Sequence, residues 1–286
     1  MVNDLSRGEK YLEAMRAKIR PGDIVLEVGT GAGLLTCLAA KLGAKHVYTV
    51  EQSRILYRVA CKTVEQNGLS DKVTLINANS RDLKAIGAIK EPIDVFVTET
   101  IGAQGLDEGI INVFKDVKPF LAPNARIIPE TVQFKHCLIN MSGIREQLEV
   151  TTPIFDVDLS ALNDELPSNN HFWMNPIEMW REISTTAATP VYDLLDFEPH
   201  DCTQTMQITR DNVCDGLLNW AEFLLSPNNT IETRCRHFGG NWANSLYLMN
   251  RCYVTRSQMC TSTMRIADDR LDWLFNWTIG EPTTSR

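Results

Sequence analysis

The stretch Ile24-Val25-Leu26-Glu27-Val28-Gly29-Thr30-Gly31-Ala32-Gly33-Leu34 decides the expected fold of the N-terminal half. Residues 24–28 form an apolar run typical of a buried strand, and residues 34–42 have a helical pattern that stops at Gly43. Glycines between a strand and a helix let the backbone approach a ligand closely, and the free N–H groups at the helix start attract negative oxygens. The stretch therefore predicts a ligand-binding turn between a first strand and its helix.

The alternation of strand and helix continues to residue 128. We expect further strands at residues 47–51, 73–76 and 93–99, and helices at residues 55–67 and 109–121. A turn is predicted at Pro123-Asn124, before Arg126-Ile127-Ile128-Pro129. Such alternation is typical of a parallel sheet covered by helices. The sequence thus predicts an α/β, Rossmann-like domain over residues 1–128.

Beyond Pro129 the pattern changes to an alternation with a period of two. It is clearest at residues 131–139, 204–208, 245–254 and 273–279. We therefore expect a mostly antiparallel, β-barrel-like domain over residues 129–286. An irregular insertion at about 159–196 holds Phe172-Trp173-Met174 and Met179-Trp180. It either packs on another subunit, covers a site, or lies against its own domain.

Composition excludes several classes of protein. With 286 residues and 44% hydrophobic content the chain can bury a large core. No apolar run reaches about eighteen residues and Met1-Val2-Asn3-Asp4-Leu5 lacks a signal-peptide pattern, so we expect a soluble, cytoplasmic protein without a membrane partner. The eight cysteines include no Cys-x-x-Cys pair, which predicts reduced thiols and no metal site. A net charge of −8 argues against a nucleic-acid partner.

The spacing of the glycines narrows the choice of ligand. A dinucleotide fingerprint, Gly-x-Gly-x-x-Gly, would need its third glycine at Leu34, whereas Gly33 comes one residue early. Glu51 ends the second strand and Gln52 follows it, at a place where a carboxylate can accept hydrogen bonds from both hydroxyls of a ribose. Glu51 indicates an adenosine ligand without saying which one. The residues after the third strand where an adenine ring would rest are Asn79, Ser80 and Arg81.

Two acids follow the fourth strand. Glu99 closes that strand and Glu108 comes nine residues later, across a loop that contains Gly102 and Gly105. Ligands of open α/β sheets bind at the carboxyl ends of the strands, which makes both acids candidate catalytic residues. Taken separately, Glu99 could be an ordinary strand-end acid, and Glu108 an acid favoured at the N-terminus of a helix.

The combination resembles a known family. Glu27-x-Gly29-x-Gly31-x-Gly33 looks like the methyltransferase version of the turn, and Glu99 and Glu108 at this interval resemble the double-glutamate loop of protein arginine methyltransferases. Asp4-x-x-Arg7-x-x-x-Tyr11 is similar to the family's segment before the first strand. The resemblance implies that S-adenosylmethionine is the cofactor, that Arg7 contacts its carboxylate, and that the protein is a homodimer. It also implies that the turn, with Glu27, Gly29, Gly31, Gly33 and Leu34, receives the amino acid end of the cofactor.

The chemistry of a guanidine explains why two acids would lie there. A guanidinium is a planar fork of donors that carboxylates grip bidentately. If its positive charge is held toward the carboxylates, the other terminal nitrogen keeps more lone-pair density with which to attack a methyl group.

The sequence departs from the family in three places. Gly239-Gly240-Asn241-Trp242 resembles the family's Thr-His-Trp loop on the substrate side, with Asn241 in place of the histidine. The resemblance implies that Asn241 and Trp242 are catalytic residues. Asparagine cannot carry a proton away near neutral pH. Ala103 and Gln104 stand where larger side chains are usual, and the chain begins without the family's preceding aromatic helix.

These departures leave several hypotheses. The first is an N-methyltransferase of a small guanidino or amino compound. The alternatives are a protein arginine methyltransferase and a catalytically silent scaffold that binds the cofactor. A Rossmann oxidoreductase comes last because of the misplaced glycine.

Overall fold

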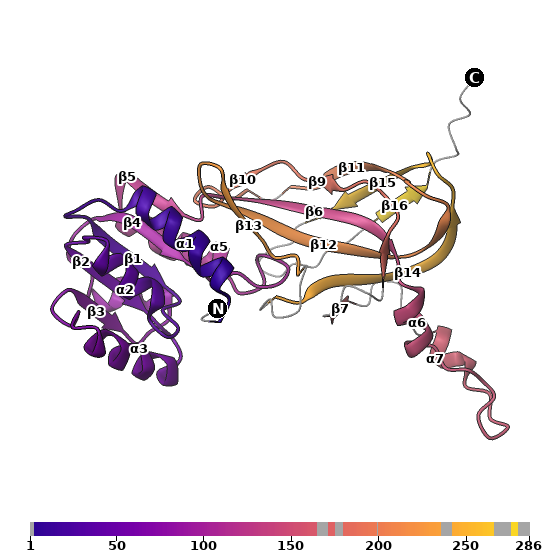
Figure 1. The fold of residues 1–286 in the computed structure, drawn as a ribbon, viewed down its shortest axis with the longest axis horizontal. Helices are drawn as coiled ribbons and strands as arrows, with labels where there is room; N and C mark the ends of the chain where they lie inside the picture. Colours follow the sequence, from indigo (N-terminus) through magenta and orange to yellow (C-terminus); the bar gives the residue numbers. More distant parts are fainter. Residues whose placement is uncertain are drawn as a thin grey trace.

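The computed structural model describes residues 3–164, 171–174, 180–198, 200–235, 242–265 and 276–279. Figure 1 shows a parallel sheet with its helices at one end of the long axis and long antiparallel strands at the other. No helix among these residues is both long enough and apolar enough to cross a membrane.

The N-terminal half is a five-stranded parallel sheet with the order β3-β2-β1-β4-β5. Its strands are β1 (Ile24–Val28), β2 (His46–Val50), β3 (Val73–Ile76), β4 (Ile93–Thr98) and β5 (Leu121–Ile128). Its helices are α1 (Leu5–Lys18), α2 (Leu34–Lys41), α3 (Arg54–Gln66), α4 (Leu83–Ile86) and α5 (Ile110–Val117), with short 3-10 turns η1 (Ser80–Asp82) and η2 (Lys118–Phe120). Every residue of the central strand β1 is buried, as its apolar sequence predicts. The α/β, Rossmann-like fold is confirmed.

Two details of this half differ from the expectation. The turn predicted at Pro123-Asn124 is wrong, because both residues belong to β5. This strand lies at the edge of the sheet, where a proline is tolerated, and its register with β4 shifts between Ile93 and Val95. The helix expected at residues 109–121 ends at Val117 and continues as η2.

The second half is mostly antiparallel, which confirms the expected fold class. The largest sheet has the order β10-β6-β12-β14-β7, and β8, β9 and β13 pair beside this path. Its strands are β6 (Thr131–Asn140), β7 (His171–Met174), β8 (Arg181–Glu182), β9 (Ala187–Ala188), β10 (Tyr192–Asp193), β12 (Asn212–Ser226), β13 (Asn229–Glu232) and β14 (Asn244–Val254). A three-stranded sheet holds β11 (Cys202–Gln207), β15 (Met259–Met264) and β16 (Asn276–Ile279). In the range 159–196 the short strands β8, β9 and β10 pair with β6.

An arm formed by residues 142–164 projects from the far end of the second half (Figure 1). It contains α6 (Ser142–Leu148) and α7 (Ser160–Asp164). At its tip Ile154 and Val157 exchange backbone hydrogen bonds of 3.0 Å, and Phe155 and Asp156 have positive φ angles of 51° and 63°. Phe155 is 96% exposed. The arm thus presents an apolar side chain to solvent on a strained turn.

One hydrophobic core runs through both halves and fixes their relation. Phe96 and Phe114 of the parallel sheet domain and Phe134 and Phe223 of the antiparallel domain are fully buried members of the same cluster. This shared core joins the parallel sheet to the antiparallel domain.

Candidate functional site

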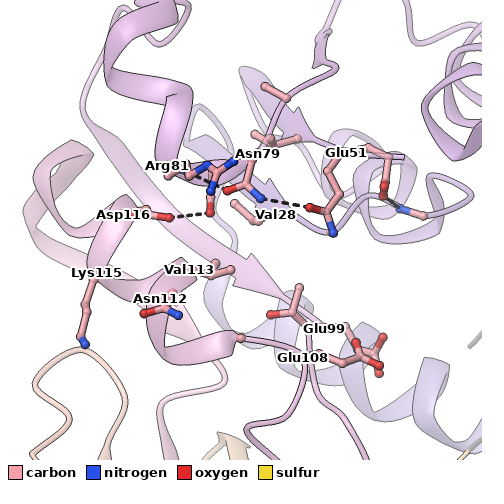
Figure 2. A pocket seen from close by; sticks show the side chains of 18 of the residues that line it. Val28, Glu51, Asn79, Arg81, Glu99, Glu108, Asn112, Val113, Lys115 and Asp116 are labelled. Carbon is pink, nitrogen blue, oxygen red and sulfur yellow. Dashed lines mark hydrogen bonds between the residues drawn. The ribbon is translucent and has the colours of Figure 1, made fainter. Parts of the chain in front are cut away.

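A cavity of about 820 Å³ lies at the carboxyl ends of the parallel strands. The predicted site residues that line it are Gly29, Gly31, Glu51, Gln52, Asn79, Ser80, Arg81, Glu99 and Glu108. Figure 2 shows Asp116 and Arg81 at one end of this cavity and Glu99 and Glu108 at the other. The sheet topology thus brings together residues that are far apart in the sequence.

The glycine turn lines the cavity with backbone. The N–H groups of Gly29 and Thr30 donate to the carbonyl of Val50, at 2.9 and 3.2 Å, which ties the turn to the end of β2. Gly31 has a φ of +54°, and a Cβ added there would meet no atom within 4 Å, so this position faces open space. Gly33 has a φ of +89° and is the N-cap residue of α2, which Leu34 begins. Neither Gly33 nor Leu34 lines the cavity.

Glu51 is buried and held from two sides. Its Oε2 accepts from the backbone N–H of Gly31 at 2.9 Å, and its Oε1 accepts from the N–H of Ser53 at 2.7 Å. Each carboxylate oxygen thus accepts one hydrogen bond from the backbone and can accept a further one from a ligand in the cavity. Beside it, Gln52 accepts from the Asn79 amide at 3.0 Å.

Glu27 lies behind the turn and not in the cavity, contrary to the expected cofactor contact. Its Oε2 accepts from the hydroxyls of Thr36 and Thr49, the second at 3.0 Å. Burial raises the pKa of Glu27 to about 8, against the opposing effect of these hydroxyls. The alternation of side chains along a strand explains its place, because Glu27 points away from the face that Val28 turns to the cavity.

At the end of the cavity away from Glu99 and Glu108, η1 and α5 face each other (Figure 2). The hydroxyl of Ser80 donates to Oδ2 of Asp116 at 2.6 Å. Asn79 uses its own amide locally, since its Oδ1 accepts from the N–H of Arg81 at 3.2 Å and its Nδ2 donates to Gln52. The sequence reasoning did not identify Asn112, Val113 and Asp116, which line the cavity from α5. Asn112 and Asp116 are four residues apart and so lie on one face of the helix that follows Glu108. This spacing could have identified both residues from the sequence.

Glu99 follows β4 and is paired with an arginine. Nη1 of Arg7 donates to Oε1 of Glu99, while its Nη2 contacts Asp4 at 3.0 Å. The Arg7 guanidinium also lies 3.7 Å from the centre of the Trp242 ring, a cation–π contact. Burial raises the pKa of Glu99, and the charge of Arg7 opposes this shift. Arg7 is thus paired with Glu99. It does not line the cavity, where its expected contact with the carboxylate of the cofactor would lie.

Glu108 completes the acidic end of the cavity. It precedes Gly109, the N-cap residue of α5. Partial burial, and secondly the charge of Asp107, raise the pKa of Glu108. Electrostatic interaction between Glu108 and Glu99 also contributes to the raised pKa of Glu99. Each carboxylate therefore gains from a cation bound between them.

Trp242 joins the antiparallel domain to this end of the cavity. Its indole N–H donates to the carbonyl of Ile101 at 2.7 Å, in the loop between the two glutamates. Trp242 therefore lies beside the acids, as expected, although its catalytic role stays a prediction. Asn241, together with Gly239 and Gly240, lies outside the described residues.

Comparison with known proteins shows similarity to methyltransferases. Residues 9–131 match the family model "Ribosomal protein L11 methyltransferase (PrmA)". The chain is 27% identical to an "Arginine N(omega)-methyltransferase" of Streptomyces achromogenes subsp. streptozoticus, over 81% of this chain and 65% of that protein. It is 26% identical to mouse "Protein arginine N-methyltransferase 7", over 81% of this chain and 36% of that protein. The chain therefore spans less than two thirds of the length of these relatives.

Solved structures share the whole architecture. A chain of the Trypanosoma brucei PRMT1 enzyme-prozyme heterotetrameric complex with AdoHcy superposes with a TM-score of 0.81 at 17% identity, covering 98% of this chain and 96% of that one. Arabidopsis thaliana protein arginine methyltransferase 10 gives 0.79 at 18% identity, covering 100% and 93%. The chain has an arginine-methyltransferase fold. At these identities the structural likeness concerns the fold, and the chemistry rests on the site.

The cavity of this arginine methyltransferase-like chain fits S-adenosylmethionine. Gly31 leaves open space where a side chain would project, and Glu51 is fixed where ribose hydroxyls can donate to it. The acids at the far end suit the positive charge of a sulfonium and of a guanidinium. The residues available to hold the cofactor are Gly29, Gly31, Glu51, Ser80, Val113 and Asp116.

Proposed function

We propose that this protein is an S-adenosylmethionine-dependent N-methyltransferase that acts on a guanidino or amino nitrogen of a small arginine-like molecule. One observation carries the proposal: Glu99, in the wall of a cavity suited to the cofactor, already accepts a guanidinium, that of Arg7. Trp242 stacks on the same guanidinium. This corner of the site therefore has the chemistry that recognises a planar cation.

The two glutamates have distinct tasks in the proposed reaction. When bound, the cofactor supplies a methyl group on a positively charged sulfur. Glu99 and Glu108 hold the substrate guanidinium by charge-assisted hydrogen bonds and draw its positive charge to their side. The nitrogen that faces away would then be free to attack the methyl group that bound S-adenosylmethionine would supply, and a carboxylate or water would take up the proton lost from that nitrogen. Alignment of the nitrogen is the main contribution of the residues.

One observation favours a small substrate over an arginine in a protein. The name of the Streptomyces relative refers to arginine itself, whereas the name of the mouse relative refers to protein arginine. Protein arginine remains the second candidate, and the experiment below separates the two.

We also propose that the protein forms a homodimer through its arm. Phe155, Val157 and Leu162 expose apolar surface on the arm, and Ile55 and Val59 expose apolar surface on α3. Figure 1 shows α3 and the arm at opposite ends of one molecule, so these surfaces can meet only between copies. A two-fold pair would bury both surfaces of both copies.

The proposed activity is tested by mass spectrometry with a cofactor whose methyl group is deuterated. The panel contains arginine, agmatine, simple amines and an Arg-Gly-rich peptide, each incubated with wild type, Glu99→Gln, Glu108→Gln and Glu91→Gln. We expect methylation of a small guanidine or amine, and a loss on the order of a hundredfold in each of the first two variants, because each removes one preorganised charge from the transition state. Glu91, an exposed acid paired with Lys45, is the matched control and should leave the rate unchanged.

Each other outcome has a definite meaning. Methylation of the peptide alone would replace the small-molecule proposal with the protein arginine alternative. Cofactor binding without methylation of any compound would contradict the proposed substrate class and favour the silent scaffold.

A further inference from the structure

Within the part of the chain that the structure describes, the loop of residues 100–107, between the two glutamates, is held against the antiparallel domain at Ile101, Gly105 and Gln104. The indole of Trp242 donates to the Ile101 carbonyl. Gly105 lies so close to β12 that an added Cβ would be 2.5 Å from the Cβ of Ala221. At the third point Nε2 of Gln104 donates to the hydroxyl of Tyr247 at 2.9 Å.

The third contact is a buried hydrogen bond between two domains. Gln104 is 7% exposed and Tyr247 is 6% exposed, so water competes little for either group. Tyr247 lies on β14 opposite Leu217 of β12, in register with the central strand of its sheet. The sheet therefore holds the Tyr247 hydroxyl in place, and the Gln104 side chain connects the loop to this hydroxyl.

A short path leads from Gln104 to a proposed catalytic acid. The backbone N–H of Gln104 donates to Oδ1 of Asp107 at 3.0 Å, and the N–H of Gly105 donates to the Gly102 carbonyl at 3.0 Å. These bonds close the loop into a compact turn, and Asp107 is the neighbour of Glu108. The backbone of Gln104 is thus connected to Glu108 through Asp107, whereas Glu99 is held separately at the end of β4 by Arg7.

We propose that Gln104 and Tyr247 are a positioning pair. Their hydrogen bond fixes the position of Glu108 relative to Glu99 and thereby the orientation of the bound guanidinium. The inference rests on the proposed function for its catalytic consequence. The hydrogen bond itself makes no contact with substrate. Its loss should reduce the turnover number more than the substrate KM, because a misaligned nitrogen still binds but attacks poorly.

The test compares Gln104→Leu, Tyr247→Phe and the double variant with wild type. Gln133→Leu is the matched control, since it removes a glutamine that donates to the Thr189 carbonyl at 2.8 Å within the same domain. The measurements are kcat and KM on the compound that wild type methylates, the affinity for S-adenosylhomocysteine, and hydrogen–deuterium exchange of the peptide that covers residues 100–109.

We expect roughly a tenfold fall in kcat in each single variant and a fall in the double variant that is smaller than the product of the two, because the two residues share an interaction. Exchange in the loop should become faster, while the affinity for S-adenosylhomocysteine and the control variant stay as in wild type. Tyr247→Phe removes one oxygen only, so it carries the test if Gln104→Leu does not fold.

The inference and the proposed function fail in different ways. Independent, additive effects of the two substitutions on kcat, or unchanged loop exchange in both single variants, would overturn the positioning pair. If wild type methylates no compound of the panel, the proposed function fails, and loop exchange still decides whether the pair holds the loop.

Discussion

At the scale of single residues, Glu27 shows how position on a strand changes the role of an acid. Glu27 is 1% exposed, and its carboxyl accepts hydrogen bonds from the hydroxyls of Thr36 and Thr49. No cation neutralises it among these contacts, and burial raises its pKa to about 8. Glu27 is thus protonated near neutral pH and acts as a structural hydrogen-bonding group behind the glycine turn.

Glu27→Gln should change how stability depends on pH. In the unfolded chain the pKa of Glu27 has its ordinary value of 4.5, so the folded state loses stability as pH rises from about 4.5 to about 8. The loss is at most about 1.4 kcal/mol per pH unit. Glutamine keeps an acceptor for both threonines and does not titrate. Thermal unfolding measured from pH 5 to 9 tests this. The melting temperature of the variant minus that of wild type should increase as the pH rises. A constant difference would contradict this account.

At the scale of elements, the cofactor cavity depends on the meeting of η1 and α5. Ser80 and Asp116 form one hydrogen-bonded pair across it, and Asn79 is engaged with Arg81 and Gln52. The free acceptor capacity at this end therefore belongs to the carboxylate of Asp116 and the oxygen of Ser80. We expect this pair to bind the exocyclic amino group of an adenine, which is a donor.

Asp116→Asn should weaken binding of S-adenosylhomocysteine about tenfold, because an amide presents a donor where the carboxylate accepts. Isothermal titration with S-adenosylhomocysteine and with S-inosylhomocysteine measures the preference of the protein for adenine over hypoxanthine. The inosine analogue carries a carbonyl in place of the amino group, so this preference should be smaller in the variant than in wild type. Asp82→Asn, at an exposed acid of η1, is the control. Equal preference in wild type and in Asp116→Asn would show that another group recognises the base.

At the scale of the whole molecule, the arm projects away from the antiparallel domain with an exposed apolar side chain at its tip (Figure 1). Its tip holds Phe155 in a left-handed conformation that costs energy, and the side chain packs on little of its own chain. Ile55, at the other end of the molecule, is 74% exposed. Association of two copies would explain both.

Light scattering at micromolar concentration tests the homodimer. Wild type should have the mass of a dimer, and Phe155→Ser should shift it to monomer, because the substitution removes the apolar side chain at the tip of the arm. Val191→Ser, at an exposed apolar residue outside the arm, should stay dimeric. A wild type that is monomeric throughout would remove the proposal.

The sequence by itself determined the parts of this protein that depend on neighbouring residues. The glycine turn after β1, Glu51 after β2 and Glu99 after β4 follow from local spacing, because a strand that ends at a known residue places the next side chains at the sheet edge. Only the tertiary structure decided the pairings: Ser80 with Asp116, Arg7 with Glu99 and Gln104 with Tyr247. These partners are 36, 92 and 143 residues apart in the chain. The first two contacts depend on how helices and turns pack around the parallel sheet, and the third on how the two domains pack on a shared core. No local pattern encodes either kind of packing.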